Sequence, residues 1–196
     1  GGSCLLGSIN LAECVTEPFT PRAAFDFDLF KQCVRACVRA LNEVLDEGMP
    51  LHPLEEQRES VRDWRQIGLG IMGLADMLIK MGIPYGDQDS QELCDRIGFA
   101  MADTAIAASA MMAKEQGMFP KCSINAIMDT PYFEANTSAP TKELVKKYGL
   151  HNSQLLTIAP TGTLSTMLGI SGGIEPVFAN YYVRKTESLH GKDVYY

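Results

Sequence analysis

Three groups of residues have types and spacing that could do chemistry. Gly68, Gly70 and Gly73 match the G-x-G-x-x-G pattern, which in dinucleotide-binding proteins turns the chain from a strand into a helix against a pyrophosphate. The segment Pro160-Thr-Gly-Thr-Leu-Ser165 combines a glycine with three hydroxyl side chains. Cys4 supplies a thiol close to the start of the sequence. Each group also has a purely structural explanation.

The glycine pattern lacks the context that a dinucleotide site requires. An apolar strand must come directly before it, but residues 61–66 read Val-Arg-Asp-Trp-Arg-Gln and are largely charged. The glycines also fall within a helical apolar pattern over residues 61–81, so we expect a helix whose small residues let another element approach closely. A dinucleotide-binding oxidoreductase remains an alternative function, and a helical backbone through these glycines would exclude it.

The segment after residue 154 favours an anion site more clearly. Leu155-Leu-Thr-Ile-Ala159 is a short apolar run that predicts a buried strand. The candidate phosphate-binding residues follow it: Pro160, Thr161, Gly162, Thr163, Leu164 and Ser165. Gly162 permits a tight turn, and free N–H groups at the start of a following helix attract an anion together with the helix dipole. The structural alternative is an ordinary helix capped by a Thr or Ser side chain.

The cysteines do not predict a metal site. The six cysteines form no C-x-x-C pair and have no nearby histidine, whereas a structural zinc site needs four ligands. Cys33 and Cys37 are one helical turn apart but lack further ligands, and Cys4 could equally be a small buried apolar residue. The sequence shows no secretion signal and no apolar run long enough to span a membrane. We therefore expect a cytoplasmic protein with free thiols, in which any disulfide is catalytic.

Composition and periodicity predict one mixed α/β domain that is mostly helical. The 196 residues carry a net charge of −7, which argues against non-specific binding to nucleic acid. We expect a buried strand near the start and a surface loop over 118–140. Gly48 should end the first helix, and Asp89 should cap the third. The helices are expected over residues 26–47, 61–81, 90–116 and 141–148.

Three segments, in order, resemble the large catalytic subunit of ribonucleotide reductase. Their sequences are nearest to its adenosylcobalamin-dependent (class II) branch. The first is Cys4-Leu-Leu-Gly-Ser-Ile-Asn-Leu11, and the second is Arg65-Gln-Ile-Gly-Leu-Gly-Ile-Met-Gly-Leu-Ala-Asp76. The third is Ala159-Pro-Thr-Gly-Thr-Leu-Ser165, with Gly173-Ile-Glu-Pro176 after it. Their order and spacing extend the resemblance over nearly the whole chain.

The resemblance implies a fold and a reaction. The fold is part of a ten-stranded α/β barrel, with residues 1–196 as a single partial domain from its central to C-terminal part. The reaction is radical reduction of ribonucleotides to deoxyribonucleotides for DNA synthesis, started by a cysteine thiyl radical. A pair of cysteines supplies the two electrons and becomes a disulfide. Cys4 matches the second cysteine of that pair, and Pro160–Ser165 matches the loop that holds the substrate phosphates.

The resemblance also implies partners. These are a ribonucleotide substrate, a thioredoxin-type or C-terminal-tail dithiol, and the rest of the subunit, with adenosylcobalamin as cofactor of the parent enzyme. The family's Asn-x-Cys-x-Glu finger loop is absent, so we expect an inactive fragment that could pair with a second copy. The amides after Ala159 and the Cys4 thiol should face one cavity. A non-catalytic helical interaction module is the remaining alternative.

Overall fold

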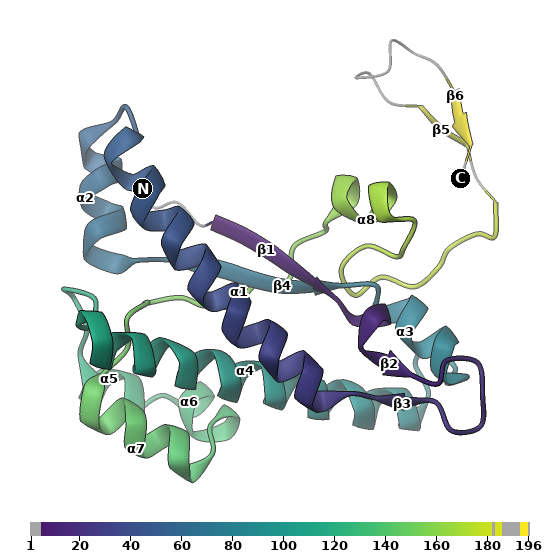
Figure 1. Cartoon of the computed structure of the whole chain (residues 1–196), viewed down its shortest axis with the longest axis horizontal. Coiled ribbons are helices and arrows are strands. Elements are labelled where there is room, and N and C mark those ends of the chain that lie inside the picture. The colour runs from purple at the N-terminus through teal and green to yellow at the C-terminus, as the bar shows by residue number, and fades with distance from the viewer. Residues whose placement is uncertain (1–4, 182, 186–192, 196) are drawn as a thin grey trace.

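The computed structural model describes residues 5–181, 183–185 and 193–195. Helices follow one another along most of the chain, and the strands are short (Figure 1). The helices are α1 (Phe27–Gly48), α2 (Glu55–Trp64), α3 (Leu74–Met81), α4 (Gln88–Gln116), α5 (Ile124–Met128), α6 (Pro131–Asn136), α7 (Ala139–Tyr148) and α8 (Gly162–Leu168), with 3₁₀ turns η1 (Leu11–Cys14) and η2 (Met49–Leu51). The strands are β1 (Leu5–Asn10), β2 (Val15–Thr16), β3 (Ala24–Phe25), β4 (Ile67–Met72), β5 (Val183–Lys185) and β6 (Asp193–Tyr195).

Strand β4 is the centre of a small parallel sheet. One edge pairs with β1 in a register that runs from Leu5 opposite Ile67 to Asn10 opposite Met72. The other edge pairs with residues 154–157, where Leu69 N donates to Leu155 O at 2.8 Å and Thr157 N donates to Leu69 O at 3.0 Å. The predicted strand over 155–159 is therefore only partly correct, since it forms one isolated bridge rather than a full strand. The result is a mostly helical α/β arrangement, as predicted.

The expected helix over residues 61–81 is wrong. The segment divides into α2, β4 and α3. The breaks fall at Arg65 and Gly73, whose φ angles are +45° and +70°. Within β4, glycines alternate with apolar residues, and a Cβ at Gly70 would lie 2.8 Å from Thr157 O. The glycines thus permit close approach of another element, as expected, but from a strand rather than from a helix.

Helices α1 and α4 supply most of the core. Helix α1 lies across β1 and β4, and α4 runs beside it (Figure 1). Phe30, Val34 and Val38 recur at every fourth position of α1 and are fully buried, which is the spacing of one helical face. The helix predicted over 26–47 is confirmed, but Gly48 does not end it in a left-handed conformation. Gly48 has φ −79° and the helical backbone continues through it.

The remaining elements show where local signals succeed and fail. Helix α4 ends at Gly117 as predicted, but its cap is Asp87, whose Oδ1 accepts a bond from Ser90 N, and not Asp89. The expected loop over 118–140 instead contains the short helices α5 and α6, while the predicted helix over 141–148 is confirmed as α7. None of the described helices combines the length and apolarity needed to cross a bilayer.

Candidate functional site

The start of α8 presents a set of backbone amides. Thr161 occupies the N-cap position with φ +52°, a left-handed conformation, and its side chain does not cap the helix. Its Oγ1 instead accepts a hydrogen bond from Gly173 N at 2.9 Å. The first helical bond runs from Ser165 N to Thr161 O at 2.8 Å. The amides of residues 162–164 precede that bond, so they have no partner within the helix.

Residues 171–173, which we call the return segment, pack against this loop and fix its shape. A Cβ at Gly172 would lie 2.8 Å from Pro160 O, and a Cβ at Gly173 would lie 3.0 Å from Ala159 O. Gly173 also has φ +48°, a conformation that glycine adopts without strain. The two backbones therefore approach more closely than residues with side chains would allow.

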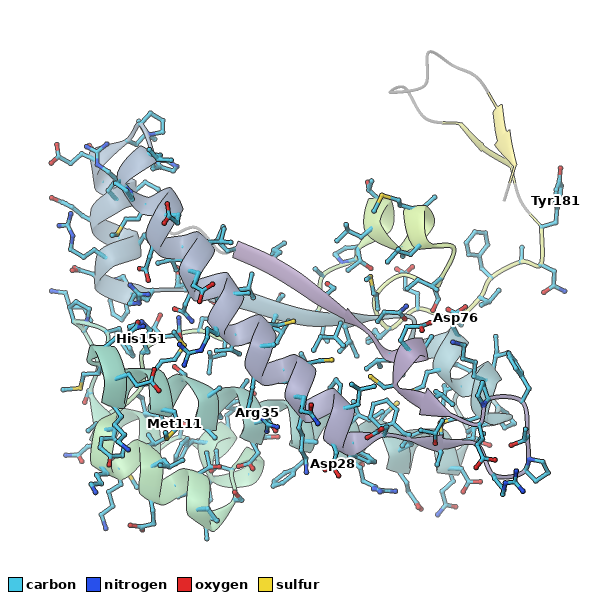
Figure 2. All side chains as sticks on the ribbon, viewed as in Figure 1. Asp28, Arg35, Asp76, Met111, His151 and Tyr181 are labelled. Carbon is cyan, nitrogen blue, oxygen red and sulfur yellow. The ribbon has the colours of Figure 1, made fainter. Side chains whose placement is uncertain are left out.

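The return segment is fastened to the β4–α3 turn. Ser171 N donates to Asp76 Oδ2 at 2.7 Å, and Ser171 O accepts from Gly73 N at 2.9 Å. Asp76 lies in the first turn of α3, close to the loop (Figure 2). Asp76 is not among the residues predicted for this site, although it lies within a segment that carries the family resemblance.

A cavity of about 540 Å³ opens beside the loop. Of the six predicted phosphate-binding residues, Pro160, Gly162 and Ser165 line it. Thr161 is engaged with Gly173, and Thr163 and Leu164 are exposed without lining the cavity. The remaining lining residues are Asp76, Thr166, Gly169, Ile170, Ser171, Gly172, Glu175, Pro176, Val177, Phe178, Ala179 and Asn180.

The electrostatics of this cavity depend on the backbone. Its lining contains two carboxylates, Asp76 and Glu175, and no lysine or arginine. Asp76 already accepts a hydrogen bond from Ser171 N. An anion here would be bound by the amides and dipole at the start of α8 and would have to stay away from Glu175. The arrangement can position a phosphate, but it supplies no cationic side chain of its own.

The predicted Cys4 site lies outside the described residues. On β1, a Cβ at Gly7 would contact Leu41 of α1 at 3.4 Å, so Leu6 and Ser8 point to the opposite face of the strand. No described residue of β1 lines the loop cavity. That Cys4 and the loop face one cavity therefore stays a prediction.

Three of the other thiols, those of Cys14, Cys37 and Cys94, have raised pKa values. Cys14, Cys33, Cys37, Cys94 and Cys122 are all free. Burial, with a smaller contribution from neighbouring Cys33, raises the pKa of Cys14 to about 11. Burial likewise raises the pKa of Cys37 and of Cys94. Because the thiolate is the nucleophile, burial makes these three thiols weak nucleophiles at neutral pH. The described part of the chain holds no cluster of three or more metal-ligating side chains.

The glycine pattern does not form a dinucleotide site. A helical backbone through these glycines would have excluded it, and the backbone of residues 67–72 is a strand instead. However, Gly68 and Gly70 lie inside β4, and only Gly73 is at the strand-to-helix turn. In dinucleotide-binding proteins the glycines form the turn itself. The Gly73 amide is also occupied, because it donates to Ser171 O. The geometry thus gives the dinucleotide alternative no support.

Comparison with known proteins assigns the whole length of the chain to one group. Residues 1–195 match the family model described as "Ribonucleotide reductase, barrel domain". The vitamin B12-dependent ribonucleoside-diphosphate reductase of Thermoplasma acidophilum is 36% identical over 192 residues, which are 98% of this chain and 22% of the relative. The protein of the same name from Mycobacterium tuberculosis is 35% identical over 188 residues, 96% of this chain and 24% of the relative.

Relatives also occur outside the proteins named B12-dependent. The ribonucleoside-diphosphate reductase subunit alpha of Chlamydia pneumoniae is 30% identical over 208 residues, covering 94% of this chain and 19% of the relative. The chain therefore spans about a fifth to a quarter of the length of these relatives.

Proposed function

The chain belongs to the ribonucleotide reductase barrel-domain family, and we propose that it is a partial domain, residues 1–196, that positions the substrate phosphates in a reductase catalytic subunit. One observation carries this proposal. Three successive amides, those of residues 162–164, stand uncapped at the start of α8, and Gly162 lines a cavity of about 540 Å³. Fixing the phosphates places the ribose against the reacting groups, and such positioning contributes strongly to catalysis.

The proposed reaction of the parent subunit is reduction of a ribonucleoside diphosphate or triphosphate to its deoxy form. A thiyl radical on another part of the subunit removes the 3′ hydrogen, and the 2′-hydroxyl leaves as water. Two thiols supply the two electrons and become a disulfide. We assign Cys4 to this pair because it opens a family-like segment that continues directly into β1.

Adenosylcobalamin is proposed only for the parent enzyme. The cofactor would supply the radical, and two relatives are named as vitamin B12-dependent. A corrin ring supplies the equatorial ligands of its own cobalt, so its binding needs no cluster of metal-ligating side chains. We assign no contact with the corrin to the described residues.

The partners follow from the same family membership. We propose a ribonucleotide, a dithiol reductant of thioredoxin or C-terminal-tail type, and the rest of the subunit, in the cytoplasm, where free thiols persist. The rest of the subunit, or a second copy, would cover apolar side chains that are exposed on β1, on α8 and on the segments before and after α8. These side chains are Leu6 (60%), Ile158 (58%), Met167 (72%) and Phe178 (77%).

Nucleotide binding tests the phosphate loop directly. Calorimetric titration should show that the chain binds ADP and that adenosine, which lacks the phosphates, binds far more weakly. Gly172→Ala should weaken ADP binding by about tenfold or more, because its Cβ would meet Pro160 O. Gly98→Ala is the matched control, since nothing lies within 4 Å of its Cβ. Equal affinity for ADP and adenosine would contradict the proposal.

Thiol labelling tests the position of Cys4. If Cys4 faces the same cavity as the loop, bound ADP should slow alkylation of Cys4 by iodoacetamide. Alkylation of Cys122, which lies between α4 and α5, should not change. Labelling of Cys4 at the same rate with and without bound ADP would separate the two sites and remove the assignment.

A further inference from the structure

A second groove lies between α1 and α4. The two helices run in the same direction, since the Arg96 guanidinium lies 4.8 Å from the Phe27 ring centroid near one end and Arg39 pairs with Glu115 at 3.1 Å near the other. Between them is a depression of about 510 Å³. We call it the α1–α4 groove and define it by Lys31, Arg35 and Arg39 on α1 and by Ala107, Ala108 and Met111 on α4. It shares no lining residue with the loop cavity.

One wall of the groove is basic. Lys31, Arg35 and Arg39 recur at every fourth residue of α1 and so lie in a row on one face. Arg39 is paired with Glu115, whereas Lys31 and Arg35 form no ion pair within the part of the chain that the structure describes. This row stands out in a chain whose net charge is −7. Two cations are therefore available to an acidic partner.

The groove's own carboxylate is already engaged. Asp103 lies at one end of the groove. Its Oδ1 accepts hydrogen bonds from Ser138 N at 2.8 Å and from Ser138 Oγ at 2.9 Å. These bonds hold the Asp103 side chain toward the start of α7, so Asp103 does not form an ion pair with the basic row.

The part of the opposite wall and floor formed by Ala107, Ala108 and Met111 is apolar. Ala107 and Ala108 carry only methyl groups, and Met111 beyond them is 38% exposed (Figure 2). Small residues let a third helix approach closely, and an adaptable methionine packs against varied apolar side chains. A row of cations at helical spacing beside such a floor matches an amphipathic helix with acidic residues at the same spacing. A free phosphate or a nucleic acid would leave this apolar floor uncovered.

We propose that the α1–α4 groove is a docking site for an acidic amphipathic helix of a partner protein. Carboxylates of that helix pair with Lys31 and Arg35, and its apolar side chains cover Ala107 and Met111. The proposal does not rest on the proposed function, because the groove shares no lining residue with the loop cavity.

Fluorescence anisotropy with a defined probe tests the proposal. The probe is a labelled synthetic helix of about 15 residues with Glu at every fourth position and Leu three residues after each Glu. A matched probe carries Gln in place of Glu. The wild-type chain should bind the Glu probe about tenfold more tightly than the Gln probe, and added salt should reduce that difference.

Charge reversal locates the binding site. Lys31→Glu and Arg35→Glu should each weaken binding of the Glu probe by about fivefold to tenfold. Ala107→Leu should weaken binding of both probes, because it fills the floor. The control Arg62→Glu reverses an exposed charge on α2, outside the groove, and should leave both affinities unchanged. Circular dichroism checks that each variant is folded.

Three outcomes would overturn the proposal. One is that the Glu probe does not bind or binds no better than the Gln probe. Another is that Arg62→Glu weakens binding as much as Arg35→Glu does. The third is that sedimentation shows a wild-type dimer that Arg35→Glu dissociates, because a second copy of the chain would then occupy the groove.

Discussion

Asn152→Ala should destabilise this chain more than most single substitutions, because Asn152 is the centre of a buried polar network. Its side chain is fully buried. Its Nδ2 donates to Asn42 Oδ1 at 2.7 Å and to Arg65 O at 2.9 Å, and its Oδ1 accepts from Asn42 Nδ2 at 3.1 Å and from Ser109 Oγ at 3.0 Å. The network joins α1, α4 and the approach to β4 with the segment that leads into the phosphate loop.

The size of the effect follows from the groups that lose their only partner. In the variant, Asn42 retains bonds to Val38 O and from Arg65 Nη2. The Arg65 carbonyl and the Ser109 hydroxyl hydrogen lose their partners. An unpaired buried polar group costs about 1–3 kcal/mol. The free energy of unfolding should therefore fall by about 4 kcal/mol, a large part of the 5–15 kcal/mol typical of a domain.

Urea unfolding followed by circular dichroism measures this change. Asn136→Ala is the matched control, because Asn136 is only half-buried and its side chain makes one hydrogen bond, to Tyr132 O. The control should lose less than about 1 kcal/mol. If Asn152→Ala also loses less than about 1 kcal/mol, with an unchanged dependence on urea, the network contributes little and this reasoning is wrong.

Three further predictions concern pH, the sheet and the loop. Burial lowers the pKa of His151, so the unfolded chain takes up the proton first, and stability should fall as the pH drops below about 6.5. The urea concentration at the unfolding midpoint should fall as the pH is lowered from about 7 to 5.5. An equally steep fall in the His151→Gln variant would exclude His151 as its cause. Gly70→Ala should cost about 2 kcal/mol or more in urea unfolding, because its Cβ would meet Thr157 O at 2.8 Å; a stability equal to wild type would refute the close approach. Asp76→Ala removes the acceptor of the Ser171 amide and should weaken ADP binding about fivefold or more. The affinity of Asp76→Asn should be intermediate. Equal ADP affinities of Asp76→Ala and the wild-type chain in calorimetry would rule this out.

Segments with a single strong periodicity could be predicted from the sequence. Helix α1 is 22 residues long and α4 is 29 residues long. In each, the helix predicted from local periodicity is the helix found in the folded chain. The segment 67–72 was assigned wrongly because Ile67 and Ile71 fit helical spacing, while the same residues with Leu69 also fit alternation along a strand. Only the pairing of β4 with β1 and with residues 154–157 selects the strand, and that pairing is not local.

The site was predictable in part for the same reason. The turn at Gly162 and the helix after it are local features, and the sequence of residues 160–165 predicts both. The fastening of Ser171 to Asp76 is a contact between residues far apart in sequence, which no local pattern contains. The role of Thr161 also differs from a local prediction, because its hydroxyl accepts from Gly173 N rather than from the first turn of α8.

The central position of β4 has a consequence for how the chain is made. Its two neighbours lie far from it in the sequence, one on each side: β1 precedes it by the length of α1 and α2, and residues 154–157 follow it after α3 to α7. During synthesis, β1 emerges long before its partner, and the far edge of β4 stays open until residue 157 has left the ribosome. Sheets that close through such distant pairings fold slowly and expose strand edges meanwhile. The far edge of β4 in a nascent chain should therefore stay open to pairing with other chains until residues 154–157 are available.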